Sequence, residues 1–221
     1  MDAALLELCN LHSPLPDKDR MTYSIITIAR TLGAGGEGLG RLLAGELGMR
    51  YVDGEIIEGA AARAGITAPE MARAEGRKGL IQRILDGFAL SGGGSDAPST
   101  TALAGAKGYE QLIVDVIRET AAAGNAVIVA HGAAIPLADV AGTLRVLVTA
   151  PYEVRVARLA TNGLGEVAAR RNIDESDAAR ADFLERFFDL DHEEPTHYDL
   201  VVNTDRLSVD QAARAILSMA R

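Results

Sequence analysis

Short apolar runs alternate with amphipathic segments along most of the chain. Runs of largely apolar residues predict strands that are buried on both faces of a parallel sheet, and they span residues 23–29, 49–52, 126–130, 145–149 and 199–202. Apolar residues at helical spacing predict helices between these strands, at residues 41–48, 54–63, 78–88, 109–123 and 154–188. This alternation predicts a doubly wound α/β domain, with a ligand crevice at the carboxyl ends of its strands.

Local signals mark where several of these helices begin and end. Gly48 stops the first helix, residues 162–165 break the long arginine-rich one, and Ser208 with Gln211 forms a capping box before the last. Residues 90–108, by contrast, combine Gly, Ser, Thr and Pro without helical or strand periodicity. They predict a mobile flap that becomes ordered either on binding a ligand or in an oligomer contact.

The length, net charge and cysteine content of the chain indicate how many domains it forms, which molecules it can bind and where it is located. The chain has 221 residues, enough for one well-packed domain at residues 21–221 after a short N-terminal extension at residues 1–20. Its 31 acidic and 22 basic residues give a formal charge of −9, which argues against nucleic acid or an anionic membrane as a partner. The single cysteine, Cys9, and the lack of a signal-peptide pattern favour a cytoplasmic location, and a homo-oligomer remains open.

Glycines cluster where the first predicted strand meets the first predicted helix. They are Gly33, Gly35, Gly36 and Gly38. In such a turn, backbone N–H groups and the positive end of the helix dipole bind an anion such as phosphate. A complete P-loop reads G-x-x-x-x-G-K-[ST], where the lysine reaches the outer phosphates and the hydroxyl holds magnesium. Here Gly36 stands at the lysine position and Glu37 at the hydroxyl position.

The sequence around this loop resembles the opening of the cytidylate kinase-like family, a lysine-poor branch related to bacterial cytidylate kinases. The resemblance extends to the C-terminus through AVIVAHGAAIPL, APYEVRVARL, DAARADFLERFF and HYDLVVNTDRLSVDQA, which begin at residues 126, 150, 177 and 197. It implies a P-loop NTPase-type three-layer sandwich, with a five-stranded parallel sheet between helices. It also implies a monophosphate-binding region and flap at residues 53–108 and a helical lid at residues 155–190.

The resemblance further implies a phosphotransferase that uses ATP and Mg²⁺ to phosphorylate a nucleoside monophosphate such as cytidine monophosphate, or a similar small acceptor. The implied nucleotide-binding residues are Gly33, Ala34, Gly35, Gly36, Glu37 and Gly38. The implied acceptor-binding residues are Asp53, Arg63 and His131, and the implied catalytic residues are Arg30, Arg171, Asp177 and Arg180. The spacing of Asp177 and Arg180 places both on one helical face, so that Asp177 can orient Arg180. The alignment of this segment with the family does not distinguish Arg170 from Arg171 as a second lid arginine.

Three positions lack the cation expected at a phosphate site, namely Gly36, Glu37 and His131. Glu37 is either a magnesium ligand, a residue that favours the helix dipole, or a sign that triphosphate binding is lost. Arg30 either replaces the missing lysine or is a solvated loop residue. Two functions therefore stay open: a phosphotransferase, and a catalytically silent regulatory module that binds a nucleotide or another anion.

Overall fold

The computed structural model describes residues 23–63, 100–130 and 132–220. Its centre is a sheet of five parallel strands in the order β2-β3-β1-β4-β5. The strands are β1 (Ile25–Arg30), β2 (Arg50–Val52), β3 (Ala126–Val129), β4 (Thr143–Thr149) and β5 (Leu200–Asn203). All five strands predicted from the sequence are confirmed, with boundaries that differ by no more than two residues.

Strand β1 lies at the middle of the sheet, between β3 and β4. In the register of the sheet, Ile25 is paired with Ala126 of β3 on one side and with Thr143 of β4 on the other. Residues 25–29 of β1 are all buried because helices cover both faces of the sheet. Burial on both faces explains why the strand reads as a continuous apolar run rather than as an alternating one.

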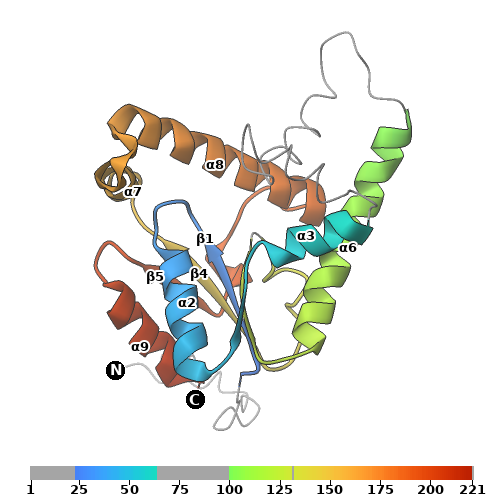
Figure 1. Cartoon of the computed structure of the whole chain (residues 1–221), viewed down its shortest axis with the longest axis horizontal. Helices are drawn as coiled ribbons and strands as arrows, with labels where there is room; N and C mark the ends of the chain where they lie inside the picture. The colour runs from blue at the N-terminus through green and yellow to red at the C-terminus, as the bar shows by residue number, and fades with distance from the viewer. Residues whose placement is uncertain (1–22, 64–99, 131, 221) are drawn as a thin grey trace, which may run out of the picture.

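Helices cover the two faces of the sheet and the carboxyl ends of its strands (Figure 1). They are α2 (Gly36–Leu47), α3 (Glu55–Arg63), α6 (Thr100–Ala122), α7 (Tyr152–Leu159), α8 (Glu166–Phe188) and α9 (Val209–Ala220), with short turns η2 (Ala160–Leu164) and η3 (Pro195–His197). Helices α2 and α9 pack on one face, whereas α3, α6 and the C-terminal part of α8 share a core cluster on the other. The three-layer fold predicted from the sequence is therefore confirmed.

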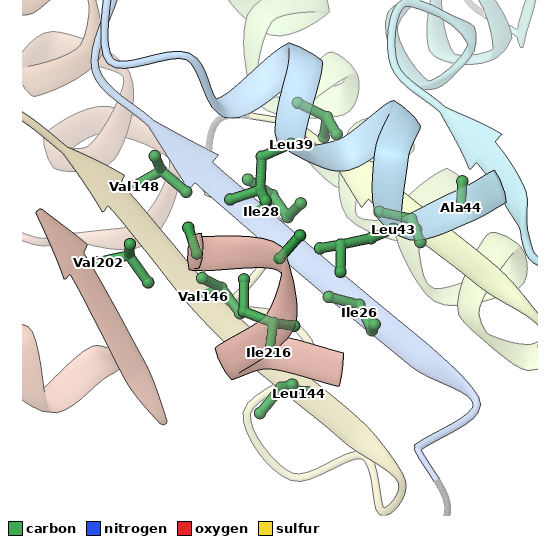
Figure 2. Packing of buried hydrophobic residues seen from close by; sticks show 14 of the residues in the cluster. Ile26, Ile28, Leu39, Leu43, Ala44, Leu144, Val146, Val148, Val202 and Ile216 are labelled. Carbon is green, nitrogen blue, oxygen red and sulfur yellow. The ribbon is translucent and has the colours of Figure 1, made fainter. Parts of the chain in front are cut away.

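The core on the α2 face fixes the position of the loop that joins β1 to α2. Ile26 and Ile28 of β1 point toward Leu39 and Leu43 of α2, and Ile216 of α9 closes the same cluster (Figure 2). Each of these five side chains is fully buried. Burial of a side chain of this size stabilises a fold by about 1.5–3 kcal/mol. The helix that follows the glycine loop is therefore anchored firmly to the central strand.

The structure corrects one prediction and leaves others outside the described residues. Residues 100–108 belong to helix α6, although the sequence predicted a mobile flap there. Alanine, leucine and lysine in this segment are strong helix formers, and the segment continues directly into the periodic helix at 109–122. The rest of the predicted flap, the helix at 78–88 and the N-terminal extension lie outside the described residues.

The predicted break in the long arginine-rich segment is confirmed. Helix α7 ends at Leu159, the π-helical turn η2 follows, and α8 begins at Glu166. Gly163 and Gly165 have φ angles of 95° and 76°, which glycine adopts with little strain. In the part of the chain that the structure describes, no helix combines the length and apolar character needed to cross a membrane.

Candidate functional site

The glycine loop joins the end of β1 to the start of α2. Gly33 and Gly35 have φ angles of 81° and 84°, a region that favours glycine. Gly35 is the N-cap of α2 and supplies no side-chain cap. Because the first turn of a helix has N–H groups without intrahelical acceptors, this end of α2 is suited to bind an anion.

A cavity of about 380 Å³ opens in front of this loop. It is lined by five of the six residues predicted to bind nucleotide, which are Gly33, Gly35, Gly36, Glu37 and Gly38. The sixth, Ala34, lines a neighbouring cavity with residues 204–209. Three arginines and one glutamate line the first cavity and give it a formal charge of +2; they are Arg30, Arg41, Arg158 and Glu37. The cavity therefore combines a positive charge with a helix N-terminus.

Arg158 of α7 connects the glycine loop to the end of β5. Its Nη1 atom donates to the carbonyl oxygen of Gly33 at 3.3 Å and to Oγ1 of Thr204 at 2.9 Å. Its Nη2 atom donates to the carbonyl oxygen of Thr204 at 2.6 Å. The Thr204 hydroxyl in turn donates to the carbonyl oxygen of Ala34 at 2.8 Å. From the sequence, Arg158 was one of several lid arginines that could neutralise the charge of a transferred phosphoryl group, and Thr204 was assigned no role.

Asp177 has a different partner from the one predicted. It was expected to orient Arg180, but its two carboxylate oxygens accept hydrogen bonds from Arg155 of α7, at 3.0 and 2.7 Å. Arg155 is only 6% exposed and also donates to the carbonyl oxygen of Leu32 at 3.4 Å. A planar guanidinium matches a carboxylate in this bidentate geometry, so the pair fastens α8 to α7 beside the glycine loop.

Arg180 is held near the end of β1 by Glu193. Its Nε atom donates to Oε2 of Glu193 at 2.8 Å, and its Nη2 atom donates to Oε1 of the same residue. The Nη1 atom donates to the carbonyl oxygen of Arg30 at 3.2 Å. The Tyr198 hydroxyl also donates to Glu193; burial raises the pKa of Tyr198, and the charge of Glu193 adds to the effect. The side chain of Arg180 thus connects α8 to the end of β1.

Arg30 and Glu37 form an ion pair across the glycine loop. Nη2 of Arg30 lies 2.6 Å from Oε1 of Glu37, and Arg30 is the less exposed partner, at 18% against 48%. Arg30 is therefore a cation of the cavity wall rather than a freely solvated loop residue. Glu37 lies in the first turn of α2, where a carboxylate stabilises the helix dipole.

A second cavity, of about 340 Å³, lies on the other side of Thr31. It is lined by Asp177, Arg180 and Leu184 of α8, by residues 190–193, and by Thr31 itself, which also lines the first cavity. The Thr31 hydroxyl is buried and has no hydrogen-bond partner within the described segments. The two cavities therefore adjoin at a single threonine.

Three other predicted site residues, Asp53, Arg63 and Arg171, line neither of these two cavities. Asp53 follows β2 and accepts a hydrogen bond from the Tyr51 hydroxyl at 3.1 Å. Arg63 of α3 pairs with Glu119 of α6, and both side chains are exposed. Arg171 is 72% exposed and pairs with Glu175, 2.7 Å away and one turn later on α8. His131 lies outside the described residues.

The alternative lid arginine is also bound at the surface of the molecule. Arg170 donates to Glu153 at 2.8 Å through both Nη atoms and to Glu166 one turn earlier on α8. These contacts join α8 to α7. Arg158, rather than Arg170 or Arg171, lines the glycine-loop cavity.

Tyr51 gives the protein a pH-dependent stability that can be measured. Burial raises the pKa of Tyr51 to about 12, and the neighbouring Asp53 adds to the shift. An unfolded tyrosine ionises near pH 10, so the unfolded state loses its proton first and stability falls as the pH rises from 10 to 12. We expect Tyr51→Phe to make this fall shallower in urea-unfolding measurements across that range; equal slopes would contradict the assignment.

Comparisons with known proteins agree with this architecture. The family model described as the cytidylate kinase-like family matches residues 25–206. An uncharacterised protein from Eubacterium ventriosum has a TM-score of 0.60 at 16% identity, covering 89% of this chain and 97% of its own. Shikimate kinase from Bacteroides thetaiotaomicron has a TM-score of 0.50 at 16% identity, covering 88% and 97%. At this identity the two structures show the fold alone. No curated protein matches the sequence.

Proposed function

The chain belongs to the cytidylate kinase-like family, and from this premise we propose that it is a nucleotide-binding phosphotransferase. In this proposal it transfers the γ-phosphoryl group of ATP to a nucleoside monophosphate or a similar small acceptor. The observation that carries the proposal is the cavity of the glycine loop, where the N-terminus of α2 meets Arg30, Arg41 and Arg158. Backbone N–H groups and arginines together are the usual protein ligands of phosphate groups.

The residues of this cavity fit the phosphates of ATP better than they fit magnesium. Gly33 to Gly38 would hold the phosphates, and the bound nucleotide would supply the phosphoryl group. Glu37, for which magnesium binding was one of three predicted roles, is bound to Arg30. No group of three or more His, Cys, Asp or Glu residues is placed to hold a metal ion within the described residues. The described residues that line the cavity therefore do not form a magnesium site by themselves.

The arrangement of arginines suits the charge that phosphoryl transfer develops. Negative charge spreads over the oxygens of the transferring group, and preorganised cations stabilise it. Arg30 and Arg158 line the cavity proposed for the donor. We assign the second cavity to the acceptor; Arg180 lines it together with the carboxylates of Asp177, Asp191 and Glu193. Thr31, shared by both cavities, marks the point where donor and acceptor would meet. In this proposal the chain acts mainly by positioning the donor and the acceptor and by stabilising the negative charge of the transferring group.

One observation favours the second function, a silent module that binds a nucleotide or another anion without turnover. Carboxylates of the chain itself engage three arginines near the glycine loop: Glu37 binds Arg30, Asp177 binds Arg155 and Glu193 binds Arg180. A cation that is already paired stabilises transferred charge less well than one that faces the substrate. The balance between the two functions therefore depends on whether these pairs open when a ligand binds.

The two functions differ in a direct binding and turnover experiment. ATP would be titrated calorimetrically into the purified protein with and without magnesium, and ADP formation would then be followed with a panel of nucleoside monophosphates. We expect saturable ATP binding and ADP formation with at least one acceptor. Binding without turnover on any acceptor would support the silent module. A lack of binding at millimolar ATP would contradict a nucleotide site at the glycine loop.

A further inference from the structure

The ion pair between Arg30 and Glu37 lies inside the cavity proposed to bind nucleotide. The Nη2 and Nε atoms of Arg30 both donate to Oε1 of Glu37, at 2.6 and 3.1 Å. Hydrogen bonds between a guanidinium and a carboxylate are among the strongest in proteins, and a phosphate oxygen would need the same donors. Two donors of Arg30 are thus used by the chain itself.

The glycine at the lysine position of the P-loop makes this pair possible. A Cβ atom on Gly36 would lie 2.7 Å from Cβ and 3.0 Å from Cδ of Arg30. The aliphatic part of Arg30 therefore lies directly against the Cα atom of Gly36, and a larger residue there would displace it. Gly36 and Glu37 act together: the first leaves room for Arg30, and the second holds its guanidinium over the loop.

We infer that Glu37 is an internal competitor of the ligand, which occupies Arg30 in the free protein and lowers the affinity of the cavity for phosphate groups. The inference rests on the proposed function, because it assigns a role within the proposed nucleotide site. Two effects act in the same direction. A phosphate that binds Arg30 must displace a hydrogen-bonded carboxylate, and the negative charge of that carboxylate repels the phosphate at short range.

The chemistry of the ligand determines the size of this effect. Glu37→Gln removes the one carboxylate that the described residues contribute to the cavity lining, and it raises the formal charge of that lining from +2 to +3. Repulsion grows with the charge of the ligand, so an inorganic tripolyphosphate should gain more affinity than inorganic phosphate. Glu37 is 48% exposed, so water and salt screen part of the repulsion, and the gain should shrink at high ionic strength.

The two other roles of Glu37 predict different results. If Glu37 held magnesium, Glu37→Gln would weaken binding in the presence of magnesium and leave metal-free binding unchanged. If Glu37 only stabilised the dipole of α2, the substitution would lower thermal stability without a gain in affinity. Of the three roles, only competition for Arg30 predicts that Glu37→Gln binds phosphate groups more tightly in the absence of a metal. It also predicts that this gain in affinity depends on Arg30.

The test compares the wild-type protein with Glu37→Gln by calorimetric titration of tripolyphosphate and of ATP, in low salt with a chelator. Glu46→Gln is the matched control, because it removes the same charge from an exposed position on the same helix. We expect Glu37→Gln to bind tripolyphosphate at least tenfold more tightly and Glu46→Gln to stay within twofold. Most of the gain should disappear when Arg30→Ala is added, and only the part that comes from charge repulsion should remain. Thermal unfolding checks that each variant folds, and Glu37→Ala replaces Glu37→Gln if it does not.

The outcomes separate this inference from the proposed function. Equal or weaker binding by Glu37→Gln, while the wild-type protein binds ATP, overturns the competition and leaves the nucleotide site in place. A gain that is undiminished in the Arg30→Ala background overturns the role of Arg30 as the contested cation. If neither the wild-type protein nor Glu37→Gln binds ATP or tripolyphosphate at millimolar concentration, the glycine loop is no phosphate site and both proposals fail.

Discussion

Replacing Arg158 by alanine is expected to lower the affinity for ATP by about 100-fold. Arg158 is half-buried, a hydrogen bond to a charged group typically contributes about 1.5–3 kcal/mol, and 100-fold corresponds to about 2.7 kcal/mol. Arg158 lines the glycine-loop cavity and the neighbouring cavity with Ala34, and it holds the carbonyl oxygen of Gly33. The substitution therefore removes a cation and loosens the loop at once. Calorimetric titration with ATP measures the change.

Two control variants separate these two causes. Thr204→Val removes the hydroxyl that bonds Ala34 and Arg158 but keeps the cation, so it should cost about tenfold if loop geometry contributes. Arg214→Ala removes a positive charge from the exposed side of α9 and should stay within twofold. If Arg158→Ala bound ATP as tightly as Arg214→Ala, the nucleotide would have to bind elsewhere on the molecule.

The strands and the glycine loop were predictable because their signals are local. A strand buried on both faces must be apolar throughout, and this requirement alone gave β1 and β3 within two residues of their true ends. The loop was equally visible, because its positive φ angles at Gly33 and Gly35 favour glycine. The capping box of Ser208 and Gln211 was also confirmed, since its two reciprocal hydrogen bonds join residues only three positions apart.

The partners of the arginines were not predictable, because they come from distant parts of the chain. Helical spacing suggested Arg180 as the partner of Asp177, three residues away. The packing of α7 against α8 instead brings Arg155 to Asp177 across 22 positions. Arg158 reaches Gly33 across 125 positions, because the sheet order places the ends of β1, β4 and β5 side by side. Such pairs follow from topology, and residue spacing carries no signal for them.

The failed prediction at residues 100–108 has a similar origin. Glycine, serine and threonine are enriched in loops, and their density in this segment suggested a flap. Composition is a weak guide where a helix already forms next to the segment, because each added residue extends an existing nucleus. The two glycines of this segment each disfavour the helix by about 1 kcal/mol, which its alanines partly offset. The helix therefore begins at Thr100 rather than near Tyr109.

Replacing Glu193 by alanine is expected to destabilise the protein by about 3 kcal/mol. Arg180 is 6% exposed, and Glu193 binds two of its nitrogens and accepts the hydrogen bond of the Tyr198 hydroxyl. Removing one partner of a buried ion pair leaves the other charge poorly compensated, which typically costs about 3–5 kcal/mol. Urea unfolding at neutral pH measures the loss. Glu185→Ala, at an exposed position on α8, should change stability by less than about 0.5 kcal/mol.

A double variant shows whether this pair is kept for stability or for function. Arg180→Met with Glu193→Leu replaces both charges by apolar side chains, and such exchanges of a buried pair are often neutral or stabilising. We therefore expect the double variant to recover most of the stability lost in Glu193→Ala, yet to lose turnover because the second cavity no longer has its arginine. A stable double variant with normal turnover would exclude Arg180 from the reaction. A double variant as unstable as Glu193→Ala would show that the geometry of the pair, rather than an uncompensated charge, determines the loss.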